Sequence, residues 1–145
     1  MCLLTKRKII LEELLHTVRS KRYGGIALFL GVVRNRSEDL SHRKHFQRVV
    51  HLEYSTYDKM ALKKMKEIEN KILQKWGKKG IGKVAMVHRL GKLSVGEISV
   101  GVAVSAVHRR ESLESCRYAI EQIKKSVPIF KKEFFSNNKS FWIGC

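Results

Sequence analysis

The sequence predicts an α+β fold with a largely antiparallel sheet. Three segments carry apolar residues at helical spacing, and other segments show the alternation or the apolar runs of strands. These segments mix along the chain without the regular strand–helix–strand rhythm of a parallel sheet. The chain has 145 residues, with no internal repeat and no linker rich in proline or glycine. We therefore expect a single domain over residues 1–145.

The N-terminal part is expected to contain one helix and two strands. Residues 8–20 have apolar side chains mostly three or four positions apart, which is the spacing of a helix. Two glycines end this segment, and residues 26–33 form an apolar run that predicts a strand buried on both faces. Residues 34–48 are polar and rich in His, Arg and Lys, so we expect a mobile loop before a second strand at 49–55.

A second helix and two further strands follow. Residues 57–76 carry one apolar stripe at helical spacing with the lysines largely outside it, and Gly77 provides a stop. Residues 83–89 have the pattern of a strand. In residues 98–107, bulky branched side chains alternate with small ones. This alternation predicts a strand with one bulky face and one face that another element can approach closely.

The C-terminal part begins with the third main helix, at residues 110–126. Its apolar side chains recur at spacings of three and four and are Leu113, Cys116, Ile120, Ile123 and Val127. Pro128 ends this helix, because proline cannot donate the next backbone hydrogen bond. Short strands are expected at 129–135 and 140–143.

Net charge is the unusual feature of the composition. Thirty Lys and Arg residues against thirteen Asp and Glu residues give a formal net charge of +17. Such a field attracts nucleic acids, acidic proteins and phosphorylated small molecules, and does not choose among them. No apolar run has the roughly 18–20 residues of a membrane helix, and the N-terminal sequence lacks a signal-peptide pattern. We therefore expect a cytoplasmic protein that does not contact a membrane.

Cysteine and histidine patterns argue against a metal site. The cysteines are odd in number, widely spaced and in no CxxC pair, so neither a disulfide framework nor a zinc site is indicated. Cys116 is expected to be a small buried apolar residue. The spacing of His42, His45 and His51 fits neither a helix face nor a compact ligand set. His88 is interpreted as a structural histidine, hydrogen-bonded within its strand.

The candidate functional residues are basic side chains at the ends of predicted elements. Arg34 directly follows one strand, and His108 and Arg109 directly follow another. Lys124 and Lys131 flank the only proline. A guanidinium offers a planar fork for phosphate, and a lysine among other cations can move a proton or act as a nucleophile. The sequence holds no P-loop, dinucleotide-binding, HExxH or GxSxG pattern.

Four blocks of sequence carry a family resemblance. They are FLGVVRN at 29–35 with LEYSTY at 52–57, VHRLGKL at 87–93 with VGE at 95–97, SAVHR at 105–109, and a fourth from 123 to 133 that contains VPIFKKE. In this order and spacing they resemble the large (catalytic) subunits of molybdopterin synthase, the MoaE type. The resemblance covers most of the chain from Gly24 to Trp142.

The resemblance implies an α/β-hammerhead fold and a transferase, specifically a sulfurtransferase, of molybdenum cofactor biosynthesis. Two sulfurs would pass from a small ubiquitin-like carrier subunit, charged as a C-terminal Gly-Gly thiocarboxylate, to cyclic pyranopterin monophosphate, giving molybdopterin. The assembly would be a homodimer with one carrier on each protomer, a heterotetramer overall. No cofactor or metal would be needed, because sulfur is added before molybdenum arrives.

The resemblance also implies the site residues. Lys124 and Lys131 would be catalytic and would lie at the carrier's tail and the pterin. The residues implied to bind substrate are Val32, Val33, Arg34, His108, Arg109, Lys124, Lys131, Lys132 and Glu133. The main alternative is a basic nucleic-acid-binding module without enzymatic activity, which the charge favours, although no RNP-like, KH-like or zinc-finger pattern supports it. A family member that has lost its activity is a further alternative.

Overall fold

The computed structural model describes residues 1–36 and 48–143. Most of the basic loop expected at 34–48 therefore lies outside the described residues, as do His42, His45 and Cys145. Within the described ranges the helices are α1 (Leu11–Val18), α2 (Asp58–Trp76), the short 3-10 helix η2 (Gly77–Lys79) and α3 (Arg109–Ser126). The strands are β1 (Cys2–Thr5), β2 (Gly25–Val32), β3 (Val49–Thr56), β4 (Ile81–Arg89), β5 (Gly91–Ser94), β6 (Ile98–Ala106), β7 (Ile129–Phe135) and β8 (Ser140–Ile143).

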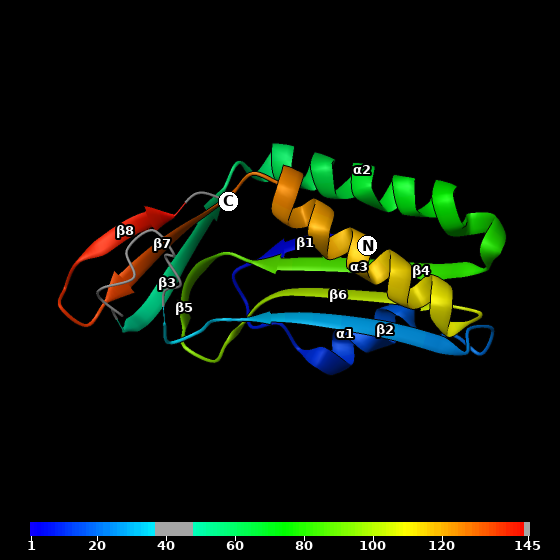
Figure 1. The fold of residues 1–145 in the computed structure, drawn as a ribbon, viewed down its shortest axis with the longest axis horizontal. Coiled ribbons are helices and arrows are strands. Elements are labelled where there is room, and N and C mark those ends of the chain that lie inside the picture. The colour runs from blue at the N-terminus through cyan, green and yellow to red at the C-terminus, as the bar shows by residue number, and fades with distance from the viewer. Residues whose placement is uncertain (37–47, 144–145) are drawn as a thin grey trace.

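These strands form two four-stranded sheets (Figure 1). The first sheet has the order β1-β4-β6-β2, and the second sheet has the order β5-β3-β7-β8. Only β1 and β4 pair in parallel among the described strands. The predicted α+β class with largely antiparallel pairing is confirmed. The strands divide between two sheets because β5 pairs with β3, whereas β6, which follows β5 after a tight turn, pairs with β2 and β4.

Helices cover both faces of the first sheet (Figure 1). Val84 and Met86 of β4 belong to the core formed with α2 and α3. Ala85 and Val87, which alternate with them, pack with Leu14 of α1 on the other face. Because successive side chains of a strand point to opposite faces, one apolar run supplies both cores.

The two faces of β6 differ in bulk as the alternation predicted. Val102 and Val104 face α2 and α3, and Ala103 belongs to the core formed with α1. Gly101 lies close to α1, since a Cβ built there would lie 2.8 Å from Cδ2 of Leu14. The small face of β6 therefore lets α1 pack directly on the sheet.

The apolar stripe of α2 is buried as expected, with every residue at most 3% exposed: Ala61, Met65, Ile68, Ile72 and Trp76. The stripe expected for α3 is only partly correct, because Leu113 is 60% exposed. The buried face of α3 instead includes Ser112, Ser115 and Ala119. The two serine hydroxyls donate to carbonyls of their own helix, which satisfies them without partners on the sheet.

The expectation that residues 26–33 are buried on both faces was wrong. β2 is an edge strand of the first sheet, and Ile26, Leu28 and Val32 are 38–49% exposed. An apolar run indicates a buried central strand only if both faces are covered, and α1 packs on β4 and β6 instead. β2 therefore presents an apolar edge.

The core continues from one sheet to the other. The larger buried cluster joins Met86 and Val102 of the first sheet to Leu52, Leu93 and Ile129 of the second. β1 and β5 were missing from the elements expected from sequence, because four residues are too few to show a periodic pattern. In Figure 1 the second sheet stands beyond one end of the first.

Candidate functional site

The candidate residues that follow strands of the first sheet lie at its two opposite ends. β2 and β6 are antiparallel, so the start of β2 lies beside the end of β6. Arg34, which follows β2, is therefore at the end of the sheet opposite to His108 and Arg109, which follow β6 (Figure 1). We call the end with Arg34 the lysine end, because Lys124 and Lys131 lie near it, and the opposite end the His108 end.

Helix α3 spans the distance between the two ends. Arg109 is its first residue, and Lys124 lies fifteen positions further on, about 22 Å along the helix axis. Lys124 is close enough to His88 for its charge to act on that side chain. His88 pairs with Val100 near the start of β6, which places Lys124 at the lysine end.

Backbone hydrogen bonds hold the segment that carries Arg34. Val33 is buried, donates its N–H to the carbonyl of Glu97 at 3.0 Å and accepts the N–H of Gly96 at 2.8 Å. Val32 and Arg34 on either side of it are exposed. Arg34 can therefore present its guanidinium to an anion from a fixed main chain.

A buried aromatic pair joins the two sheets beside the lysines. The rings of His88 on β4 and Tyr54 on β3 meet edge to face, with their centroids 5.1 Å apart. Nδ1 of His88 lies 2.8 Å from the carbonyl oxygen of Arg89, which can only accept, so Nδ1 carries the proton. Burial, and then the charge of Lys124, lower the pKa of His88 to about 4. The interpretation of His88 as a structural, hydrogen-bonded histidine is confirmed.

Lys131 and Glu133 extend this cluster onto β7. Lys131 lies directly across the ladder from Tyr54. Its Nζ is 3.5 Å from Oε1 of Glu133, whose side chain is only 6% exposed. Oε2 of Glu133 is buried and has no hydrogen-bond partner among the described residues. Lys131 therefore has a nearly buried counter-ion, which holds its ammonium at the lysine end.

Lys132 is not part of this cluster. It lies between Lys131 and Glu133 in the strand, so its side chain points to the opposite face. There its Nζ lies over the rings of Phe134 and Trp142, at 5.3 and 5.4 Å from their centroids. The structure therefore separates Lys132 from the two residues beside it in sequence.

His108 and Arg109 form the start of α3. His108 is the N-cap residue with an extended backbone, and its side chain makes no capping hydrogen bond. Both residues are exposed, and Arg110 follows them. The N-terminus of a helix carries a partial positive charge, so this end of the sheet also favours anions.

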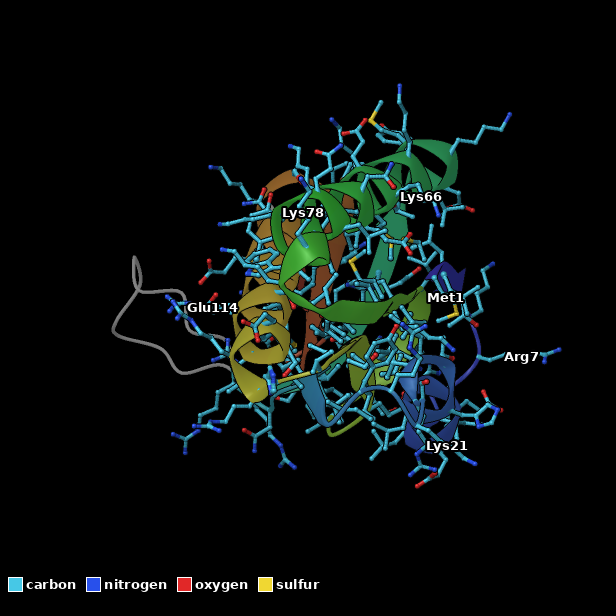
Figure 2. The ribbon with its side chains drawn as sticks, turned by 90° about the vertical axis from the view of Figure 1, so that its right-hand side faces the viewer. Met1, Arg7, Lys21, Lys66, Lys78 and Glu114 are labelled. Atoms are coloured by element: carbon cyan, nitrogen blue, oxygen red, sulfur yellow. The ribbon has the colours of Figure 1, made fainter. Side chains whose placement is uncertain are left out.

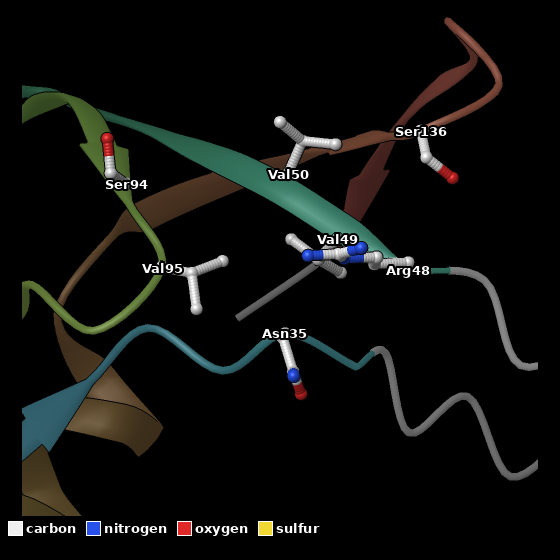
Figure 3. A pocket seen from close by; sticks show the side chains of 7 residues that line it. All are labelled: Asn35, Arg48, Val49, Val50, Ser94, Val95 and Ser136. Atoms are coloured by element: carbon white, nitrogen blue, oxygen red, sulfur yellow. The ribbon is translucent and has the colours of Figure 1, made fainter.

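A hollow of about 430 Å³ lies beside the segment that carries Arg34 (Figure 3). It is lined by Asn35, Arg48, Val49, Val50, Ser94, Val95 and Ser136. Asn35 joins Val49 through a 3.0 Å backbone hydrogen bond at its rim. The lining combines valines with one arginine and small polar groups, a mixture that suits a ligand with one anionic and one less polar part.

The described residues include no cluster of three or more His, Cys, Asp and Glu that could hold a metal ion. Cys116 is buried, as expected, and burial raises its pKa to about 11. No helix in the described part of the chain is long and apolar enough to cross a membrane. Figure 2 shows that basic side chains such as Arg7, Lys21, Lys66 and Lys78 stand out from several elements rather than from one patch.

Fold and site together define a small α+β protein with cationic groups at both ends of one sheet. A family model described as "MoaE protein" matches residues 4–126, and the chain belongs to this family. It is 38% identical to a molybdopterin synthase catalytic subunit of Taeniopygia guttata, over 96% of this chain and 88% of that protein. It is 40% identical to the protein of that name from Pyrococcus abyssi, over 92% of this chain and 82% of that one.

Solved structures show the same fold. A molybdopterin synthase structure from Staphylococcus aureus superposes with a TM-score of 0.86, at 33% identity, over 98% of this chain and 96% of that one. A complex of subunits 1 and 2 of molybdopterin-converting factor from Helicobacter pylori superposes with a TM-score of 0.74, at 22% identity, over 97% of this chain and 88% of that one. The fold prediction is thereby confirmed.

Sequence reasoning from single residues missed the support around the lysines. Tyr54 lies across from Lys131 only through the pairing of β3 with β7, which single residues do not reveal. Glu97 and Arg89 lie within blocks that carry the family resemblance, which was the one available signal for them. Their connection to Arg34 depends on the backbone hydrogen bonds of Val33 to Gly96 and Glu97, which lie far from Val33 in the sequence.

Proposed function

We propose that this chain is the catalytic subunit of a molybdopterin synthase. It would take two sulfurs from a thiocarboxylated carrier subunit and transfer them to cyclic pyranopterin monophosphate, giving molybdopterin. The observation that carries this proposal is that Arg34 and Lys124 lie at the same end of the first sheet, where Lys131 of the second sheet lies across from Tyr54, and that a hollow lies beside the segment that carries Arg34. Both reactants are anions, so a cationic site would draw them together and stabilise charge that develops during transfer.

The proposed roles follow from the chemistry of each group. Arg34 offers a planar fork for the phosphate. Lys124 and Lys131 would hold the thiocarboxylate and move protons as sulfur enters the pterin. Each transfer leaves a carboxylate on the carrier, so an oxygen from the pterin or from water replaces each sulfur without a change in oxidation state. Glu133, within 3.5 Å of Lys131, would keep that ammonium in position.

A reconstituted sulfur-transfer assay tests the proposal. Purified chain, thiocarboxylated carrier and cyclic pyranopterin monophosphate are mixed, and molybdopterin is measured as its fluorescent oxidation product. We expect Lys131→Ala to lower the rate by roughly a hundredfold or more, in the range that positioned proton-transfer groups contribute. The substitution leaves the nearly buried carboxylate of Glu133 without its counter-ion, so we also expect some loss of stability, and rates are compared at a temperature at which thermal unfolding shows the variant to be folded.

Lys125→Ala is the matched control, since Lys125 is an exposed lysine next to Lys124 on the same helix. It should retain the rate of the wild-type chain. Normal turnover by Lys131→Ala would refute its catalytic role. A folded wild-type chain that binds no carrier, makes no product and binds nucleic acid with a steep salt dependence would instead favour the nucleic-acid-binding alternative.

The proposed assembly is a homodimer, each protomer carrying one carrier. Two observations support it. β2 has β6 as its one neighbour among the described strands and exposes apolar side chains along its length. The candidate residues are split between two ends about 22 Å apart. Two copies paired through β2 about a two-fold axis would run antiparallel, which would bring Arg34 of one protomer toward the His108 end of its partner.

We also propose that the chain acts as one domain in the cytoplasm. The shared core of the two sheets supports the first point. Cys2 and Cys116 are free thiols, which is typical of proteins in a reducing compartment.

A further inference from the structure

The motif VHRLGKLSVGE holds an ion pair that the proposed sulfur transfer does not use. Nη1 of Arg89 donates to Oε2 of Glu97 at 2.8 Å, and the two side chains are 11% and 24% exposed. Lys8 lies 3.7 Å from the other oxygen of Glu97, but its side chain is 77% exposed. Arg89 is therefore the principal partner of this carboxylate.

Glu97 shapes the turn at residues 94–97 that joins β5 to β6. Its own N–H donates to the carbonyl of Ser94 at 3.1 Å, and its Oε2 accepts the N–H of Ser94, also at 3.1 Å. Gly96 has a φ of 88°, the left-handed value that the third residue of a type II turn requires. The Ser94 N–H, and then the charge of Arg89, lower the pKa of Glu97, so the carboxylate is charged when it accepts these bonds.

The 94–97 turn also holds the main chain next to Arg34. β2 leaves its regular register with β6 between Gly31 and Val32. Beyond that point Val33 bonds to the turn through both of its backbone groups, one to Glu97 and one to Gly96. Arg34 follows directly, so its Cα is placed by the turn and not by the sheet ladder.

The stability of the fold alone does not explain well why position 89 is an arginine. Nε of Arg89 is buried and has no hydrogen-bond partner among the described residues, which costs free energy. A buried ion pair is often no more stabilising than apolar side chains of similar volume. A rigid main chain at a binding residue is a stronger reason, because an ångström of displacement weakens a positioned contact.

We propose that Arg89 and Glu97 are positioning residues for substrate, acting through the 94–97 turn on Val33 and Arg34. The ion pair fixes the turn, the turn fixes the two backbone hydrogen bonds of Val33, and these set where the guanidinium of Arg34 meets the phosphate. This inference rests on the proposed function, because it takes Arg34 as a phosphate ligand.

Arg89→Met tests it, since methionine keeps much of the apolar volume and removes the fork. We expect the KM for cyclic pyranopterin monophosphate to rise roughly tenfold, within the range that misplacement of a binding group can cause, while kcat changes much less. The amide hydrogen of Val33 should exchange faster with solvent. In an Arg34→Ala background, Arg89→Met should raise KM no further, because the group it positions is gone.

Arg117→Met is the matched control, because Arg117 pairs with Glu121 on the exposed face of α3 at 2.9 Å. It should leave KM and the exchange of Val33 unchanged. If Arg89→Met does not fold, Glu97→Gln takes its place, since glutamine can still accept the Ser94 N–H. An unchanged KM with unchanged Val33 exchange, or effects of Arg89→Met and Arg34→Ala that multiply, would overturn the inference. A wild-type chain without turnover would overturn the proposed function instead, and the exchange of Val33 would still report on the turn.

Discussion

At the scale of single residues, the site depends on buried groups that fix their neighbours. His88 is 1% exposed and stays neutral, so it can lie near the charge of Lys124 without repelling it. Its ring packs against Tyr54, which lies across from Lys131. A buried and neutral histidine thus supports the positions of both lysines without adding a positive charge beside them.

The lowered pKa of His88 predicts a pH-dependent stability. Its pKa is about 4 in the folded chain and 6.5 when unfolded, so between these values only the unfolded state binds the proton. Stability should therefore fall as the pH drops through this window. Between pH 7 and pH 5, His88 should lower the free energy of unfolding by about 2 kcal/mol.

Urea unfolding at the two pH values measures this. His88→Asn should lose that part of the pH dependence, whatever its effect on stability at pH 7. His16→Asn, which removes an exposed histidine of α1, should keep it. Equal slopes in the wild-type chain and His88→Asn would show that His88 is not the responsible group.

The sequence could indicate some of the site residues but not how they are arranged. Arg34, Lys124 and Lys131 could be proposed from sequence because basic residues at element ends and the family resemblance both indicate them. The separation of Lys132 from Lys131 and Glu133 follows from strand alternation, once β7 is placed. The pairing of Tyr54 with Lys131, and the distance from Arg34 to Arg109, depend on strand order, which no local pattern contains.

At the scale of elements, periodicity predicted long amphipathic segments and failed for short or uncovered ones. The predictions for α2 and β6 were correct because both elements bury a periodic face against the core. The burial of β2 was misjudged because the sequence does not show that α3 packs on one face of β2 whereas α1 packs on β4 and β6, which leaves the other face of β2 without a helix. β1 pairs with a strand far along the chain and has only four residues, so nothing local indicates it.

The contact between α1 and β6 gives a prediction at this scale. Gly101→Ala would place a methyl group 2.8 Å from Cδ2 of Leu14, and α1 or Leu14 would have to move. We expect a loss of about 1–3 kcal/mol in the free energy of unfolding, as for other overpacked cores.

Gly77→Ala is the control, because a Cβ at Gly77 meets nothing within 4 Å and its backbone is already helical. This substitution should be neutral or stabilise by up to about 1 kcal/mol. Urea titration at one pH compares the two variants. Equal stabilities would mean that α1 does not depend on the small face of β6.

At the scale of the whole molecule, the split site makes activity a property of the proposed dimer. If Arg34 acts with the partner's Arg109, each site takes one residue from each chain. A dimer of Arg34→Ala with Arg109→Ala would then hold one site with both substitutions and one with neither. Such mixed dimers, purified through two different tags, should show about half the wild-type activity although each parent is impaired.

Mixed dimers of Lys124→Ala with Lys131→Ala provide the contrast. Both lysines lie at the same end of one protomer, so every site would keep one defect and activity should stay low. Failure of the Arg34 and Arg109 variants to complement one another would indicate that each protomer holds a self-contained site.

The parallel pairing of β1 with β4 also governs how the chain is made. β1 is completed within the first five residues, but its partners, Met86 to Arg89, are synthesised roughly eighty residues later. At about 5–20 residues per second, several seconds of translation separate the two strands. β1 therefore leaves the ribosome long before it has a place in a sheet, and it can be placed only after Met86 to Arg89 have been made.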